Sequence, residues 1–295
     1  MIWKTKITEM TKTKYPLVMA AFARWSSTEF AAAFSNAGGL GIVTALNYAK
    51  DTFRKELQKM KSLTDKPFGV NITVTPPRNY YNEDKFKEED YLKYVEIALS
   101  EGITIFTSSA YQAPFIGKRV HEAGCYWFHK CSLIRHALSA ERLGADAITI
   151  IGLEAAGYKN PYMHTTLVNL TVAKELLKVP IIAAGGFGDA RGIIGALVMG
   201  AEAVCLGTSI LTTKESPLDQ LRKNEWLNMD ILTEEYHRAL YHMTLKGTRV
   251  PSPAVAFQKE EKPLKMFLES LMKEAEIILK SYGFASEEFN TLQMI

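Results

Sequence analysis

One repeated unit constrains this chain more than any other feature. An amphipathic segment ends at a glycine, and a short apolar run follows at once. The unit stands at AGGLGIV, EGITIF, EAGCYWF, LGADAITI and MGAEAVCL, beginning at residues 37, 101, 122, 143 and 199. A glycine just past a helix supplies the left-handed residue that closes it, and runs this short are typical of strands. The pattern therefore predicts a βα repeat.

Eight apolar runs of three to five residues can be placed, at 17–20, 41–43, 68–72, 103–107, 126–130, 147–151, 181–184 and 203–206. Strands that are apolar at most positions are buried on both faces, as in a parallel sheet covered by helices. Helical periodicity lies between them at 27–37, 52–61, 91–100, 132–143, 167–177 and 190–199. Eight strands in about 190 residues favour a (β/α)₈ TIM barrel; a doubly wound open sheet is the alternative.

The chain changes character after the last apolar run. Residues 217–295 are charged, with helical spacing at 218–245 and 264–282. We expect residues 1–216 to form the barrel and 217–295 to add helices, within the same domain, that close it and cover its mouth. No further strand is expected. Residues 4–14 are predicted to be a solvated lead-in and residues 285–295 a tail.

Charge and cysteine content exclude several classes of function. The 35 basic and 32 acidic residues are mixed and leave a net charge of +3, which gives no support for nucleic acid or an anionic membrane as partner. Three cysteines without a CxxC spacing argue against disulfides and a metal site. There is no secretory h-region and no apolar run of membrane-spanning length. A cytoplasmic protein is expected.

Glycines follow the two strands whose loops hold phosphate in such barrels. Gly185 and Gly186 follow the seventh strand, and Gly207 and Thr208 follow the eighth. Glycine lets backbone N–H groups approach a phosphate closely. The alternative is that these glycines only make tight turns, but the matched pair favours a phosphate site.

Polar residues at three other strand ends are candidates for ligand contact. Asn71 interrupts the third run, and a buried amide needs partners; a ligand and a turn are equally good candidates. Lys130 closes the fifth run and would point into the mouth, or else lie on the surface. Glu154 and Tyr158 follow the sixth run, where Glu154 could merely cap or pair in the loop.

These residues resemble the nitronate monooxygenase family, formerly called 2-nitropropane dioxygenases. The match runs from Tyr15 to Pro217, over landmarks at 35–42, 66–71, 144–147, 184–192, 200–202 and 206–208. Flavin-dependent enoyl-acyl-carrier-protein reductases and NAD(P)H:quinone reductases share the scaffold.

The resemblance implies FMN as cofactor. By this resemblance, the end of the first strand and two positions inside the barrel contact the flavin ring. A glycine after the sixth strand lies beside the cofactor, and the glycine turns bind its phosphate. The residues concerned are Met19, Ala20, Ala21, Asn71, Lys130, Gly157, Gly185, Gly186, Gly207 and Thr208.

The chain departs from the family pattern at the catalytic position. The family motif EAGGH ends in a histidine, and here the same stretch reads EAAGY, which places Tyr158 there. Tyrosine has a pKa near about 10, so it is a poor base but a good hydrogen-bond donor. His164, six residues on, is a second candidate, with helix entry as its alternative. Arg24 could anchor an anion or remain solvated.

The leading expectation is an FMN-dependent oxidoreductase that oxidises alkyl nitronates with O2 to a carbonyl compound and nitrite. The alternative is an NAD(P)H-dependent flavin reductase of quinones or enoyl thioesters, and a third is a flavin-binding protein without turnover. Small molecules, with O2 or NAD(P)H, are the expected partners. The sequence leaves the oligomeric state open, with a homodimer as one option.

Overall fold

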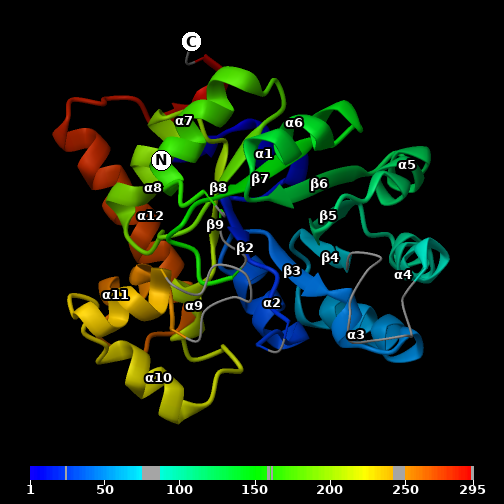
Figure 1. Cartoon of the computed structure of the whole chain (residues 1–295), viewed down its shortest axis with the longest axis horizontal. Coiled ribbons are helices and arrows are strands. Elements are labelled where there is room, and N and C mark those ends of the chain that lie inside the picture. Colours follow the sequence, from blue (N-terminus) through cyan, green and yellow to red (C-terminus); the bar gives the residue numbers. More distant parts are fainter. Residues whose placement is uncertain (24, 75–86, 158–159, 161, 242–249, 294–295) are drawn as a thin grey trace.

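The computed structural model describes residues 1–295 except 24, 75–86, 158–159, 161, 242–249 and 294–295. Eight parallel strands lie at its centre, surrounded by helices (Figure 1). Their order is β2-β9-β8-β7-β6-β5-β4-β3. A parallel bridge between Val18 and Leu40 joins the two edges, with Met19 N–H donating to the Leu40 carbonyl at 2.9 Å. The predicted (β/α)₈ barrel is confirmed.

All eight predicted strands are present. They are β2 (Leu17–Met19), β3 (Gly41–Thr44), β4 (Phe68–Val74), β5 (Ile105–Ala110), β6 (Tyr126–Cys131), β7 (Ala147–Ile151), β8 (Ile181–Ala184) and β9 (Ala203–Leu206). The glycines of the repeat have the left-handed backbone expected of helix ends, with φ of 99° at Gly38 and 97° at Gly200. The fourth strand lies two to three residues later than predicted.

Seven helices follow strands β2 to β8 around the barrel, namely α2 (Thr28–Asn36), α3 (Lys50–Leu63), α4 (Glu88–Ser100), α5 (Pro114–Glu122), α6 (Ile134–Arg142), α7 (Thr166–Leu176) and α8 (Ala190–Val198). Only α5 was not predicted. It is nine residues long and contains Gly117 in its interior, which weakens a helical pattern. Gly117 is required by packing, because a Cβ there would lie 2.2 Å from the Trp127 ring.

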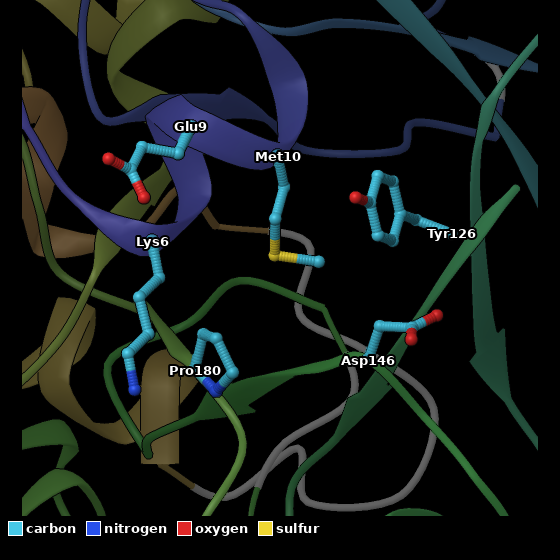
Figure 2. A pocket seen from close by; sticks show the side chains of 6 residues that line it. All are labelled: Lys6, Glu9, Met10, Tyr126, Asp146 and Pro180. Atoms are coloured by element: carbon cyan, nitrogen blue, oxygen red, sulfur yellow. The ribbon is translucent and has the colours of Figure 1, made fainter.

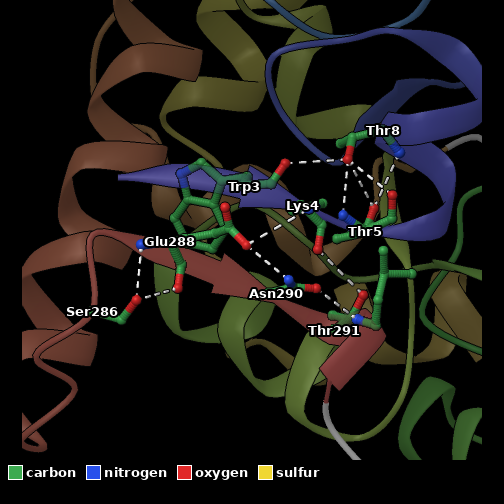
Figure 3. Close-up of polar contacts among 9 residues, drawn as sticks. Trp3, Lys4, Thr5, Thr8, Ser286, Glu288, Asn290 and Thr291 are labelled. Carbon is green, nitrogen blue, oxygen red and sulfur yellow. Dashed lines mark hydrogen bonds and ion pairs between the residues drawn. The ribbon is translucent and has the colours of Figure 1, made fainter.

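The two ends of the chain meet at the amino-end face of the barrel. Strand β1 (Ile2–Lys4) pairs in parallel with β10 (Glu288–Asn290), and α1 (Lys6–Thr11) follows β1 (Figure 3). Trp3 and Phe289 are buried, with ring centroids 5.2 Å apart. The predictions of a solvated lead-in, of a tail and of no strand after residue 217 are therefore wrong. Three-residue strands carry too little pattern to be seen alone.

A carboxylate fastens this pair of ends to the barrel. Glu202, directly before β9, is buried, and its Oε2 accepts from the Lys6 backbone N–H at 2.9 Å and from the Thr291 hydroxyl at 2.6 Å. We call β1, α1 and β10 the terminal clasp.

The C-terminal part before the clasp is helical. It contains α9 (Thr208–Leu211), α10 (Gln220–Leu227), α11 (Glu234–Tyr241), the 3₁₀-helix η2 (Pro253–Phe257) and α12 (Leu264–Ser281). The single helix predicted over 218–245 is two helices as far as residue 241. Helix α12 packs between α8 and α2, and so completes the outer ring (Figure 1). The division at residue 216 stays a prediction. No helix among the described residues is long and apolar enough to span a membrane.

Candidate functional site

The turns after β8 and β9 lie side by side at the carboxyl-end mouth of the barrel. Gly185 and Gly186 have φ of 106° and 82°, a region that residues with a Cβ rarely adopt. Gly207 is the N-cap of α9 and has no side-chain cap. The exit of β2 abuts it, because a Cβ on Gly207 would lie 3.7 Å from that of Ala20. The structure therefore brings the predicted glycines together with Ala20.

The backbone donors of these turns have no protein partner within the described part of the chain. No carbonyl or side chain there accepts from the N–H of Gly185, Gly186, Gly207 or Thr208. Among the same residues, the buried Ser209 hydroxyl also has none. Backbone N–H groups that are left without a partner at two neighbouring turns suit an acceptor such as a phosphate.

The 3₁₀-helix η2 packs over both turns. The Ser252 backbone N–H donates to the Thr208 hydroxyl at 3.2 Å, and the Gln258 amide donates to the Ser209 carbonyl. A Cβ on Gly188 would lie 2.5 Å from the Ala254 carbonyl oxygen. These contacts join residues more than 40 positions apart in the sequence, and no local pattern predicts them.

Asn71 is held by other residues of the lumen. Its amide donates to the Thr107 hydroxyl at 2.8 Å, and its carbonyl oxygen accepts from the Thr73 hydroxyl at 2.9 Å. Thr44, its register partner on β3, is buried, and its hydroxyl has no partner among the described residues. The lumen at this level is thus hydroxyl-lined, and the sequence reading missed the threonines because isolated threonines are common in strands.

Lys130 is the next-to-last residue of β6 and is half-buried. It pairs with Thr149 in register, on the same face as Phe128. Burial raises the pKa of the Cys205 thiol on β9, and the Lys130 ammonium partly offsets that rise. The orientation of the Lys130 side chain toward the mouth stays a prediction. It forms no ion pair with any described residue.

Of the three candidate catalytic residues, the structure describes only His164. Arg24 and Tyr158 lie outside the described residues. His164 is exposed, its ring centroid 6.1 Å from that of Tyr162, and its carbonyl accepts from the Leu153 N–H at 2.9 Å. All three roles stay predictions. Gly157, the predicted cofactor neighbour, is exposed, and a Cβ on it would meet no atom within 4 Å.

His129 belongs to the barrel wall and not to the mouth. It is buried, and burial lowers its pKa to about 4. The Trp127 indole donates to the Ser108 hydroxyl at 2.7 Å, and that hydroxyl lies 2.8 Å from His129 Nδ1. This series of hydrogen bonds suits a neutral His129 imidazole with its proton on Nε2, because Nδ1 then accepts from the Ser108 hydroxyl.

A second hollow lies at the amino-end face. Figure 2 shows Lys6, Glu9 and Met10 of α1 facing Tyr126, Asp146 and Pro180, which precede or begin β6, β7 and β8. In such barrels the chemistry belongs to the opposite face. Within the described residues, no group of three or more His, Cys, Asp or Glu side chains is placed to hold a metal ion.

Comparison with known proteins identifies the family. The nitronate monooxygenase family model matches residues 4–247. The chain belongs to the nitronate monooxygenase family. A probable nitronate monooxygenase of Staphylococcus haemolyticus is 28% identical over 77% of this chain and 73% of its own length.

Other relatives carry different names. A Mycobacterium tuberculosis protein named (3aS,4S,5R,7aS)-5-hydroxy-7a-methyl-1-oxo-octahydro-1H-indene-4-carboxyl-CoA dehydrogenase is 31% identical over 76% of this chain. The match spans only 60% of that relative. Among solved structures, FabK from Thermotoga maritima superposes with a TM-score of 0.80 at 26% identity, over 95% of this chain and 99% of FabK. Nitroalkane oxidase from Streptomyces ansochromogenes shares the fold, with a TM-score of 0.76 at 21% identity over 92% of this chain and 99% of its own.

Proposed function

We propose that this protein is an FMN-dependent oxidoreductase whose site is the carboxyl-end mouth of the barrel. The observation that carries the proposal is the pair of neighbouring turns whose N–H groups have no acceptor among the described residues. Membership of the nitronate monooxygenase family supports it. When bound, FMN would supply the electron transfer of the reaction.

The residues of the chain have separate roles in this proposal. Gly185, Gly186, Gly207 and Thr208 would bind the phosphate through backbone N–H groups. Asn71, kept in one orientation by Thr107 and Thr73, would meet the ring at the lumen. The Lys130 ammonium would favour negative charge there.

The finer proposal is oxidation of an alkyl nitronate by O2 to a carbonyl compound and nitrite. A nitronate is already an anion and needs no base to form it, so a tyrosine at position 158 is compatible with the reaction. Tyr158 would donate a hydrogen bond, with Arg24 and His164 as further candidates for holding the anion. The similarity to the Staphylococcus protein supports this choice.

The second candidate is a flavin-dependent reaction on a thioester, with NAD(P)H as redox partner. The similarity to a protein named as a carboxyl-CoA dehydrogenase favours it. Neutral tyrosine could donate a proton or hydrogen bond to such a substrate.

Two assays on one preparation distinguish the two candidate reactions. The protein is purified, loaded with FMN and divided between two assays: O2 uptake and nitrite release with alkyl nitronates, and anaerobic bleaching of flavin absorbance by NADH or NADPH. Nitrite release without bleaching supports the first reaction, and rapid bleaching supports the second. A colourless protein that takes up no added FMN would contradict the proposed function as a whole.

A further inference from the structure

A junction of three segments adjoins the Gly185–Gly186 turn, and Glu154 is at its centre. Its Oε2 accepts from the backbone N–H and from the hydroxyl of Thr166, each at 2.8 Å. Thr166 is the first residue of α7. The carboxylate thus caps the positive end of that helix, in addition to Thr165, whose hydroxyl accepts from the Val168 N–H at 3.3 Å.

The glycine turn rests against these two side chains. The Thr166 hydroxyl lies 3.0 Å from the Gly185 carbonyl oxygen and 3.3 Å from that of Ala184. A Cβ on Gly185 would lie 2.8 Å from that hydroxyl, and a Cβ on Gly186 would lie 3.1 Å from the Glu154 Cβ. A side chain at either glycine would therefore press on Thr166 or Glu154.

The same junction fixes the loop that leaves β7. The Gly152 N–H donates to the Ala184 carbonyl at 3.1 Å. A Cβ on Gly152 would lie 2.1 Å from the Thr166 nitrogen. Glu154 precedes Gly157 by three residues, so the predicted ring-side loop and the predicted phosphate turn are held by one cluster.

Electrostatics and positioning predict opposite effects of Glu154 on an anion. A carboxylate near a phosphate raises the energy of the bound anion, so loss of its charge alone would tighten binding. Loss of a support for the turn would weaken binding. If Glu154 only stabilised α7, its loss would leave the affinity for the anion unchanged.

We propose that Glu154 is a positioning residue that acts through Thr166 to hold the Gly185–Gly186 turn in its phosphate-binding conformation. FMN binding and the placement of the loop after β7 are thereby coupled. The inference rests on the proposed FMN binding.

The test is a set of dissociation constants for FMN and for riboflavin, which lacks the phosphate, measured by quenching of flavin fluorescence. We expect Glu154→Ala to weaken FMN binding about tenfold, the order of one charged hydrogen bond, and to leave riboflavin unchanged. Thr166→Val removes the hydroxyl bond to Glu154 and keeps the backbone one, and it should give a similar loss. The double variant should add little, because both single changes break the hydroxyl contact. Glu154→Gln keeps an acceptor oxygen and should restore most of the affinity.

Glu141→Ala is the matched control. Glu141, like Glu154, accepts two hydrogen bonds, here from the backbone N–H groups of Lys178 at 2.6 Å and Val179 at 2.9 Å, but it lies at the amino end of β8. It should leave both constants unchanged. Additive effects, equal losses for FMN and riboflavin, or no loss in Glu154→Ala would each overturn the inference. Wild-type protein that binds neither flavin would instead contradict the proposed function itself.

Discussion

The two ends of the barrel differ in how completely their polar groups are paired. At the amino-end face, the terminal clasp places Trp3 and Phe289 in a buried pair and satisfies Glu202 with two donors. At the mouth, the N–H groups of two neighbouring turns have no acceptor among the described residues. The contacts at the amino-end face stabilise the fold, whereas the mouth leaves backbone donors available for a ligand. This division is usual for the architecture.

Phe289→Ala should give the largest loss of stability. The side chain is 1% exposed, and its ring centroid lies 5.2 Å from that of Trp3 and 5.9 Å from that of Phe284. Truncation of a buried phenylalanine costs about 3–5 kcal/mol of unfolding free energy. Denaturant unfolding measures it, with the exposed Tyr282→Ala as control. If the ends are separate in function, FMN affinity at low temperature should not change; a parallel loss would show that the clasp shapes the mouth.

A pH-dependent loss of stability is expected from the barrel wall, between the two ends. The folded-state pKa of His129 is about 4, against about 6.5 for an unfolded histidine. Between these values the unfolded chain binds a proton that the folded chain does not. Stability contributed by His129 is therefore complete above about pH 6.5 and decreases as the pH falls to about 4, by at most about 3 kcal/mol.

Unfolding free energies measured from pH 4 to 7 test this expectation. His129→Gln should flatten the dependence, whereas His164→Gln, at an exposed position, should leave it unchanged. An unaltered slope in His129→Gln would assign the acid sensitivity to other groups.

The sequence predicted the barrel and the two glycine turns at its mouth because both carry local signals. Doubly buried strands are continuous apolar runs, and Gly185, Gly186 and Gly207 stand directly after two of them. The binding of phosphate by these turns stays a prediction. The terminal clasp could not be predicted, since β1 and β10 are three residues each and acquire meaning only when paired. The contact of Glu154 with Thr166 was equally hidden, because it depends on how the loop between them folds.

Gly185→Ala should show that FMN affinity depends on the mouth of the barrel and not on its amino-end face. The φ of 106° at Gly185 strains any residue with a Cβ, at a cost of about 1–3 kcal/mol, and the new methyl would also press on Thr166. Gly102→Ala is the matched control: its φ is 76°, a Cβ there meets no atom within 4 Å, and it precedes β5 at the amino end. Both variants should lose thermal stability, but only Gly185→Ala should weaken FMN binding. Equal FMN affinity in Gly185→Ala and Gly102→Ala would show that the Gly185–Gly186 turn does not bind FMN.

Thr208→Val should give the smallest effect and tests whether the cover over the mouth matters. The Thr208 hydroxyl accepts from the Ser252 N–H at 3.2 Å, and it can donate its own proton to a phosphate. Loss of one net hydrogen bond, about 1 kcal/mol, corresponds to roughly fivefold weaker FMN binding, and Thr208→Ser should retain affinity. Thr213→Val is the control, because that buried hydroxyl donates to the Ile210 carbonyl at 2.7 Å. Equal FMN dissociation constants in Thr208→Val and wild type would mean that the hydroxyl serves only η2, and that the backbone N–H groups alone distinguish the mouth from the clasped end.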